Sequence, residues 1–122
     1  MSEKTESKVI NIDDVPFYWL GEIENNTLRR IKVVLSSKYM RIHVGIFPGR
    51  QAGSKHVHEN SEEVVFVIKG KGEVYIDDKA YSIGPGSLVY TPPGVPHQYK
   101  NTGEEELVLF AVYSPPTELP SR

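Results

Sequence analysis

The sequence of 122 residues contains no cysteine, and this absence excludes disulfide bonds, zinc–thiolate sites and thiol catalysis. It also has no apolar run near the roughly 20 residues that a membrane-spanning helix needs. Residues 1–8 are polar and lack the apolar core of a signal peptide. The net charge is −2, so no basic surface suggests binding to nucleic acid. We therefore expect a soluble cytoplasmic protein with neither a membrane nor a nucleic-acid partner.

Turn-forming residues are abundant instead. Ten glycines and nine prolines stand between short apolar runs, a pattern typical of an all-β protein with many turns. The length predicts one domain, which is large enough to bury a stable core without disulfide bonds or a structural metal ion. We expect residues 1–8 to form a flexible N-terminal tail, residues 9–113 a single barrel domain, and residues 114–122 an irregular C-terminal tail.

The residues with the most chemical potential lie in two short segments. His56 and His58 are separated by one residue, so in an extended strand both rings point to the same face. Glu63 opens the apolar run that follows and can return a carboxylate to the same place. Two imidazoles and a carboxylate are a common ligand set for divalent iron, manganese, nickel or zinc. A third imidazole, His97, follows the stiff stretch Pro92–Pro96.

A histidine pair in an arbitrary strand is more often packed or solvated than bound to a metal. Here the concentration of histidine favours a metal site, because three of the four histidines fall in these two segments. Glycine and proline also frame each segment at turn positions. The fourth, His43, lies in an alternating apolar stretch. We expect His43 to have a structural or supporting role and not to bind the metal.

These segments resemble the two sequence motifs of the cupin superfamily. The first motif, G-x5-H-x-H-x3,4-E-x6-G, corresponds to residues 49–70 and is matched at His56, His58, Glu63 and Gly70. Its leading glycine departs by one position, since Gly49 precedes His56 by seven residues where the family has six. The second motif, G-x5-P-x-G-x2-H-x3-N, corresponds to residues 86–101. It is matched at every position, by Gly86, Pro92, Gly94, His97 and Asn101.

The resemblance implies a small double-stranded β-helix, also called a jelly-roll barrel, which closes off sheet edges. It also implies one divalent transition metal ion per chain (Fe, Mn, Ni, Zn or Cu) in the mouth of the barrel. The implied ligands are His56, His58, Glu63 and His97. Such a set leaves two neighbouring positions on the metal for water, substrate or dioxygen.

The apolar runs predict the strands of this barrel. The expected strands are Val9–Asp14, Thr27–Ser36 after a turn at Asn25-Asn26, Tyr39–Phe47, Val64–Ile68, Glu73–Asp77, Lys79–Ile83, Leu88–Thr91, one beginning at His97, and Leu107–Tyr113. Val64–Ile68 is apolar on both faces, which predicts that both are covered. Alternation places Glu63, Val65 and Val67 toward the interior.

Several further side chains are predicted near the metal. Tyr99 shares a strand face with His97 and is expected to flank the site. The candidates for other polar groups in the pocket are Tyr39, Arg41, Gln51 and Tyr75. The aromatic segment Val15–Leu20 could form a lid over the pocket, but packing against the barrel or a second subunit is the favoured interpretation.

Three functions are compatible with this pattern. The first is a metal-dependent enzyme, of the oxygenase type, that acts on a small oxygen-rich molecule such as an organic acid, diketone or phenol. The second is a metal-assisted isomerase or lyase of a carbohydrate derivative, which would need several charged side chains in the pocket. The third is a non-catalytic module that binds a small molecule. We also expect a homodimer, because the outer face of Val64–Ile68 needs cover that a chain this short cannot supply.

Overall fold

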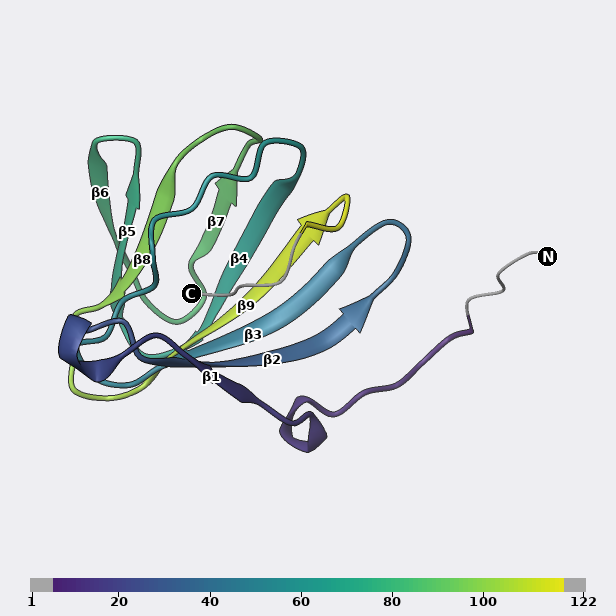
Figure 1. Cartoon of the computed structure of the whole chain (residues 1–122), viewed down its shortest axis with the longest axis horizontal. Coiled ribbons are helices and arrows are strands. Elements are labelled where there is room, and N and C mark those ends of the chain that lie inside the picture. Colours follow the sequence, from purple (N-terminus) through teal and green to yellow (C-terminus); the bar gives the residue numbers. More distant parts are fainter. Residues whose placement is uncertain (1–5, 118–122) are drawn as a thin grey trace.

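The computed structural model describes residues 6–117, and these fold into two antiparallel sheets (Figure 1). Residues of both sheets line a pocket. The larger sheet has the strand order β1-β2-β3-β9-β4-β7, and the smaller has the order β6-β5-β8. The strands are β1 Tyr18–Leu20, β2 Arg29–Ser36, β3 Arg41–Phe47, β4 Glu62–Lys69, β5 Gly72–Ile76, β6 Lys79–Ile83, β7 Leu88–Thr91, β8 His97–Asn101 and β9 Leu107–Ser114. This arrangement confirms the predicted all-β jelly-roll barrel.

The interior is apolar and lies between the two sheets. Along β4, alternate side chains point inward, and Glu63, Val65 and Val67 are at most 3% exposed. Leu107 and Leu109 of β9 and Val74 of β5 meet them there. The predicted phase of this strand is therefore correct, and it brings the carboxylate of Glu63 to the inner face.

The outer face of β4 does not follow the prediction that both faces are covered. Phe66 and Ile68 are 42% and 44% exposed. The same outer face continues onto β7, where Leu88 pairs with Phe66 and is 63% exposed. The apolar composition of β4 therefore reflects a buried inner face and an apolar outer face that the described residues of one chain leave open.

The predicted strand Val9–Asp14 is wrong. Its second half is a 3-10 helix, η1, at Ile12–Asp14. Asn11 caps this helix, because its side-chain Oδ1 accepts a hydrogen bond from the backbone N–H of Asp13 at 2.9 Å. Asparagine and aspartate side chains offer the backbone such local bonds and so favour turns over strands. The outer parts of both predicted tails, residues 1–5 and 118–122, lie outside the described residues.

The aromatic segment forms the edge of the larger sheet. Strand β1 pairs with β2, and a second 3-10 helix, η2 at Ile23–Asn25, leads into the turn at Asn26, which has the left-handed φ of 59° expected of that asparagine. Phe17 and Trp19 pack edge to face at 5.7 Å, and the guanidinium of Arg30 lies against both rings. These aromatic residues do not line the pocket, which agrees with packing and not with a lid.

Glycine is required where the chain turns from β4 to β5. Gly70 has a φ of 84°, and a Cβ at this position would lie 2.2 Å from the carbonyl oxygen of Glu106. Only glycine relieves both the backbone strain and this collision.

Within residues 6–117, no helix has the length and apolar character to cross a membrane.

Candidate metal centre

Two distant parts of the chain meet at the mouth of the barrel. His56 and His97 form an isolated antiparallel bridge, with the N–H of each bonded to the carbonyl of the other at 2.8 and 2.9 Å. The N–H of Gly94 also donates to the carbonyl of His58 at 2.9 Å. These backbone contacts fix the loop that carries His58 against the corner that precedes β8.

Three side chains converge there on one point. One ligand atom from each of His58, Glu63 and His97 lies within 4.8 Å of the others. His58 Nε2, Glu63 Oε1 and His97 Nε2 are buried, and among the described residues they have no hydrogen-bond partner apart from the contact between Glu63 and His97. Buried polar atoms are normally satisfied, so three such atoms facing one another fit a cation between them.

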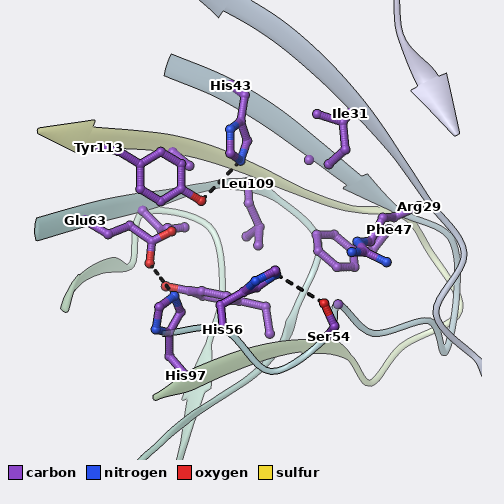
Figure 2. Close-up of a pocket in the computed structure, with 15 residues that line it drawn as sticks. Arg29, Ile31, His43, Phe47, Ser54, His56, Glu63, His97, Leu109 and Tyr113 are labelled. Carbon is purple, nitrogen blue, oxygen red and sulfur yellow. Dashed lines mark hydrogen bonds and ion pairs between the residues drawn. The ribbon is translucent and has the colours of Figure 1, made fainter. Parts of the chain in front are cut away.

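The pair formed by Glu63 and His97 supports this interpretation. Glu63 Oε1 lies 2.9 Å from His97 Nε2 (Figure 2), close to the spacing of about 3 Å expected for neighbouring ligands on one ion. On the other side of the ring, His97 Nδ1 lies 3.0 Å from the carbonyl oxygen of Val95. A proton on Nδ1 donates to that carbonyl, which leaves the Nε2 lone pair directed into the site.

His56 lies beside this group but outside it. Its ring is 5.7 Å from that of His58 and nearly parallel to it, and 6.1 Å from that of His97. His56 Nε2 is 3.3 Å from the hydroxyl of Ser54 (Figure 2). Residues 54–58 form a loop with a single bridge, not a continuous strand. The rings of His56 and His58 therefore lie side by side, but His56 is not among the three residues whose ligand atoms converge.

Burial and charge set the protonation of the site. Burial of Glu63 works against ionisation, but its contact with His97, helped by Tyr113 and His58, holds its pKa below the usual value. Burial lowers the pKa of His56 to about 4 and also lowers that of His58. Near neutral pH these groups are a carboxylate and neutral imidazoles, the forms that bind metals.

His97 differs, because burial would lower its pKa but its contact with Glu63 outweighs this effect and raises it. A metal ion between the two would replace the proton that they otherwise compete for. The charge balance of this pair therefore also fits a divalent cation.

His43 and Tyr113 support the site from the larger sheet. Tyr113 Oη lies 3.3 Å from His43 Nε2, and the rings are 5.0 Å apart (Figure 2). Burial lowers the pKa of His43 to about 4, and burial together with the charge of Glu63 raises that of Tyr113. His43 lines the pocket but is not one of the three converging residues.

The cluster opens into a pocket with a volume of about 60 Å³. Much of its wall is apolar and comes from Ile31, Phe47, Val65, Leu109 and Ala111. Its ionisable or hydroxyl-bearing lining residues are Arg29, His43, Ser54, His56, Glu63, His97, Tyr99 and Tyr113. The site is therefore a small chamber that combines an apolar wall with several convergent polar groups, a common form for small-molecule sites.

Of the predicted pocket residues, Tyr99 lines this chamber, and its buried hydroxyl has no hydrogen-bond partner within residues 6–117. Tyr39 and Arg41 do not line it. Tyr39 is 68% exposed, and Arg41 bonds to the hydroxyl of Ser36 and the carbonyl of Thr117. Both residues lie where the larger sheet reaches solvent, beyond the enclosed part of the barrel.

Gln51 and Tyr75 are also outside the chamber. Gln51 is buried, but its side-chain oxygen accepts a hydrogen bond from the N–H of Leu28 at 3.0 Å. Tyr75 donates to Glu73 at 2.7 Å and lines a separate surface hollow. Three polar wall residues, Arg29, Ser54 and Tyr113, were not predicted from the sequence.

Comparison with known proteins agrees with this geometry. The model of the cupin domain family matches residues 42–113. An oxalate-binding protein from Thermotoga maritima is 27% identical, over 75% of each chain. A glucose-6-phosphate isomerase from Thermococcus onnurineus is 33% identical, over 50% of this chain and 35% of that one. Two further relatives come from Methanocaldococcus jannaschii and Aquifex aeolicus and are 33% and 37% identical. The chain spans only about half of their length, 54% and 49%.

A solved structure shows the same fold. The crystal structure of a predicted oxalate decarboxylase from Thermotoga maritima superposes with a TM-score of 0.80 at 20% identity, covering 88% of this chain and 98% of that one. The family match spans more than half of the sequence and includes both motif segments. The chain therefore belongs to the cupin domain family.

Proposed function

We propose that this protein is a metal-dependent enzyme that acts on a small, oxygen-rich organic molecule, with chemistry of the oxygenase type. One observation carries the proposal: the buried ligand atoms of His58, Glu63 and His97 face one another, and Glu63 and His97 line the pocket. We propose His56 as a fourth ligand, since a turn of its ring away from Ser54 would direct a nitrogen toward the group. A divalent ion held there would act as a Lewis acid toward an oxygen-rich substrate.

The residues of the chain supply the surroundings of the reaction. Glu63 and the imidazoles would hold the ion. Tyr113 would orient the carboxylate, and His43 would in turn position the hydroxyl of Tyr113. The apolar wall excludes water, which strengthens electrostatic interactions inside the pocket. The unpartnered hydroxyl of Tyr99 is a hydrogen-bond donor available to a bound ligand.

A carbohydrate substrate is less well supported, although one relative is named a glucose-6-phosphate isomerase. Such a ligand needs many polar contacts, and the described pocket wall is mostly apolar. A non-catalytic binding role has a specific argument in its favour, because another relative is named an oxalate-binding protein. Enzyme and binding module share the same metal site and differ in whether the ligand is turned over.

The experiment begins with the protein as purified, whose metal is identified by mass spectrometry. Oxygen consumption is then followed with a panel of small organic acids, diketones and phenols, with the His97→Ala variant as a control that lacks one proposed ligand. Oxygen uptake by the native protein but not by the variant supports an oxygenase. If a compound of the panel binds in a metal-dependent way but is not turned over, the enzyme proposal fails and a non-catalytic binding protein is supported.

We also propose that two copies of the chain associate through the outer face of β4 and β7. Phe66, Ile68, Leu88 and Tyr90 are 42–63% exposed on this face. The pairing of Phe66 with Leu88, and of Val64 with Tyr90, makes the patch continuous across both strands. Contiguous apolar patches of this kind mark interaction sites, and a self-complementary face suits a twofold dimer.

A further inference from the structure

Arg29 is a buried cation in the wall of the pocket. It begins β2, its residue is 2% exposed, and it lines the chamber together with Phe47 and Gly53. Its Nη1 donates a hydrogen bond to the carbonyl of Thr27 at 2.8 Å, which fixes the orientation of the guanidinium. The burial of this group lowers its pKa, and an anion in the pocket would favour its charged form.

Arg29 and the metal cluster occupy opposite sides of the chamber. Figure 2 shows Arg29 across the pocket from Glu63, with Phe47 and Leu109 between them. Glu63 is the only carboxylate among the described residues that line the pocket, and it lies against His97. The pocket therefore has a guanidinium at one side, metal-ligand atoms at the other, and apolar side chains between.

Size and charge restrict what fits between these two sides. One water molecule needs about 10–15 Å³ of cavity volume, and the pocket offers about 60 Å³, so the space between the two sides is small. A divalent ion at Glu63, together with Arg29, would leave the pocket wall with a net positive charge. Both features favour a short, anionic ligand over a sugar or an extended phenol.

We propose that Arg29 is the anion-binding residue of this pocket and that its ligand is a short dicarboxylate or a similar acid with oxygen atoms at both ends. One carboxylate pairs with the guanidinium, whose planar fork suits bidentate recognition. The oxygen atoms at the other end face the metal, and the carbon atoms contact Phe47 and Leu109. The metal end of this inference rests on the proposed function, and the Arg29 end deepens it by naming the substrate class.

The test is a double-mutant cycle with malonate and its monoamide, malonamate, as probes. Wild type and Arg29→Gln, both loaded with Mn²⁺, are titrated with each probe by calorimetry. Changes in how the probe binds the metal occur in both proteins and cancel in the cycle. We expect a coupling of about tenfold or more between Arg29 and the second carboxylate, as for charged hydrogen bonds. A coupling below twofold would overturn the role of Arg29.

A second variant decides the matter if Arg29→Gln fails to fold. A Cβ at Gly53 would lie 3.5 Å from Phe47 Cε2 and 3.8 Å from Arg29 Nε, ordinary contact distances that the fold can accept. The methyl group of Gly53→Ala would occupy pocket space beside Arg29, and malonate binding should weaken by about threefold or more. Gly84→Ala, whose Cβ meets no atom within 4 Å, is the matched control. Unchanged affinity in Gly53→Ala counts against the proposal.

The Mn²⁺ electron paramagnetic resonance spectrum separates this inference from the proposed function. If malonate binds through Arg29 but leaves the spectrum unchanged, the anion subsite stands and the proposed binding of substrate at the metal fails. If malonate alters the spectrum equally in wild type and Arg29→Gln, with a coupling below twofold, the metal-centred function stands and the role of Arg29 is overturned.

Discussion

The backbone of His56 is bonded to the backbone of His97 in both directions, at 2.8 and 2.9 Å. This bridge joins segments that are far apart in the sequence, and it places the loop of His58 beside the start of β8. Because the bonds are made by the backbone, side-chain changes at these positions should leave the two segments joined. Metal binding and folding can therefore be tested separately at this site.

The first prediction concerns Glu62 and Glu63, which are adjacent and point to opposite faces of β4. Glu63→Gln keeps the side-chain shape but removes the anionic ligand, and we expect metal affinity to fall by about 100-fold or more, since even indirect partners of a metal cost about 10–100-fold. Glu62→Gln is the matched control, because Glu62 accepts a hydrogen bond from Tyr90 on the outer face at 2.8 Å.

The measurement is the metal content of each purified variant, followed by competition titration with a chelator. Loss of metal from Glu62→Gln and its retention by Glu63→Gln would show that the ligand assignment on β4 is wrong.

Motif spacing predicted much of this site because the spacing is set by local geometry. Glu63 stands seven positions before Gly70, and the glycine is held there by a backbone approach that no side chain tolerates. The distance from the turn thus fixes which glutamate faces inward. The same holds for Asn101, whose side-chain amide donates to the carbonyls of Phe47, Pro48 and Glu105 and anchors the end of β8.

Arg29 could not be predicted in the same way. Its inward direction depends on the register between β2 and β3, where Ile31 pairs with Gly45. A register shift between Val33 and Leu35 then interrupts the alternation, so strand period alone does not assign one inner face to the whole of β2. Long-range pairing of this kind leaves no local signal in the sequence.

The second prediction concerns Tyr113. Its hydroxyl lies 3.3 Å from His43 Nε2. The hydrogen bond between Tyr113 and Glu63 helps to keep the pKa of Glu63 low. Tyr113→Phe removes this support while retaining the ring, so the pKa of Glu63 should rise and metal affinity should fall by about 10-fold. Tyr90→Phe, which alters a tyrosine on the outer face, should keep wild-type affinity.

Competition titration at several pH values checks this prediction. The deficit of Tyr113→Phe should widen as the pH falls, because a carboxylate with a raised pKa is lost to protonation earlier. A deficit that is independent of pH would point to packing alone.

The third prediction concerns the acid stability of the metal-free protein. His43 is buried with a pKa of about 4, whereas a histidine in the unfolded chain has a pKa of about 6.5. Between these values the unfolded chain binds the proton and the folded chain does not. The free energy of unfolding should therefore be highest above about pH 6.5 and fall on acidification toward pH 4, with His43 contributing on the order of 2–3 kcal/mol.

Urea unfolding of chelator-treated protein across this pH range measures the slope. His43→Leu should flatten it in part, since His56 also has a pKa of about 4 and keeps its own contribution.

In the metal-loaded protein, protons compete with the ion for the imidazoles, so bound metal and melting temperature should fall together below about pH 5–6. Metal that stays bound at about pH 4 would argue against a site built on histidines.

The last prediction concerns the exposed face of β4 and β7. Leu88 is 63% exposed at the centre of this patch, opposite Phe66. If the face joins two copies of the chain, Leu88→Glu places a desolvated charge in the interface and should convert the dimer to a monomer. Tyr81→Glu is the matched control, because Tyr81 is 48% exposed on β6 of the other sheet.

Light scattering at micromolar concentration should give about twice the chain mass of 13.7 kDa for wild type and for Tyr81→Glu, and about the single mass for Leu88→Glu. The melting temperature of Leu88→Glu should depend less on protein concentration than that of wild type, because association no longer contributes to its stability. If wild type has the mass of a single chain, the dimer proposal is contradicted and the apolar face has no assigned partner. A dimer that persists in Leu88→Glu would move the interface elsewhere, with the edge formed by Phe17 and Trp19 as the next surface to test.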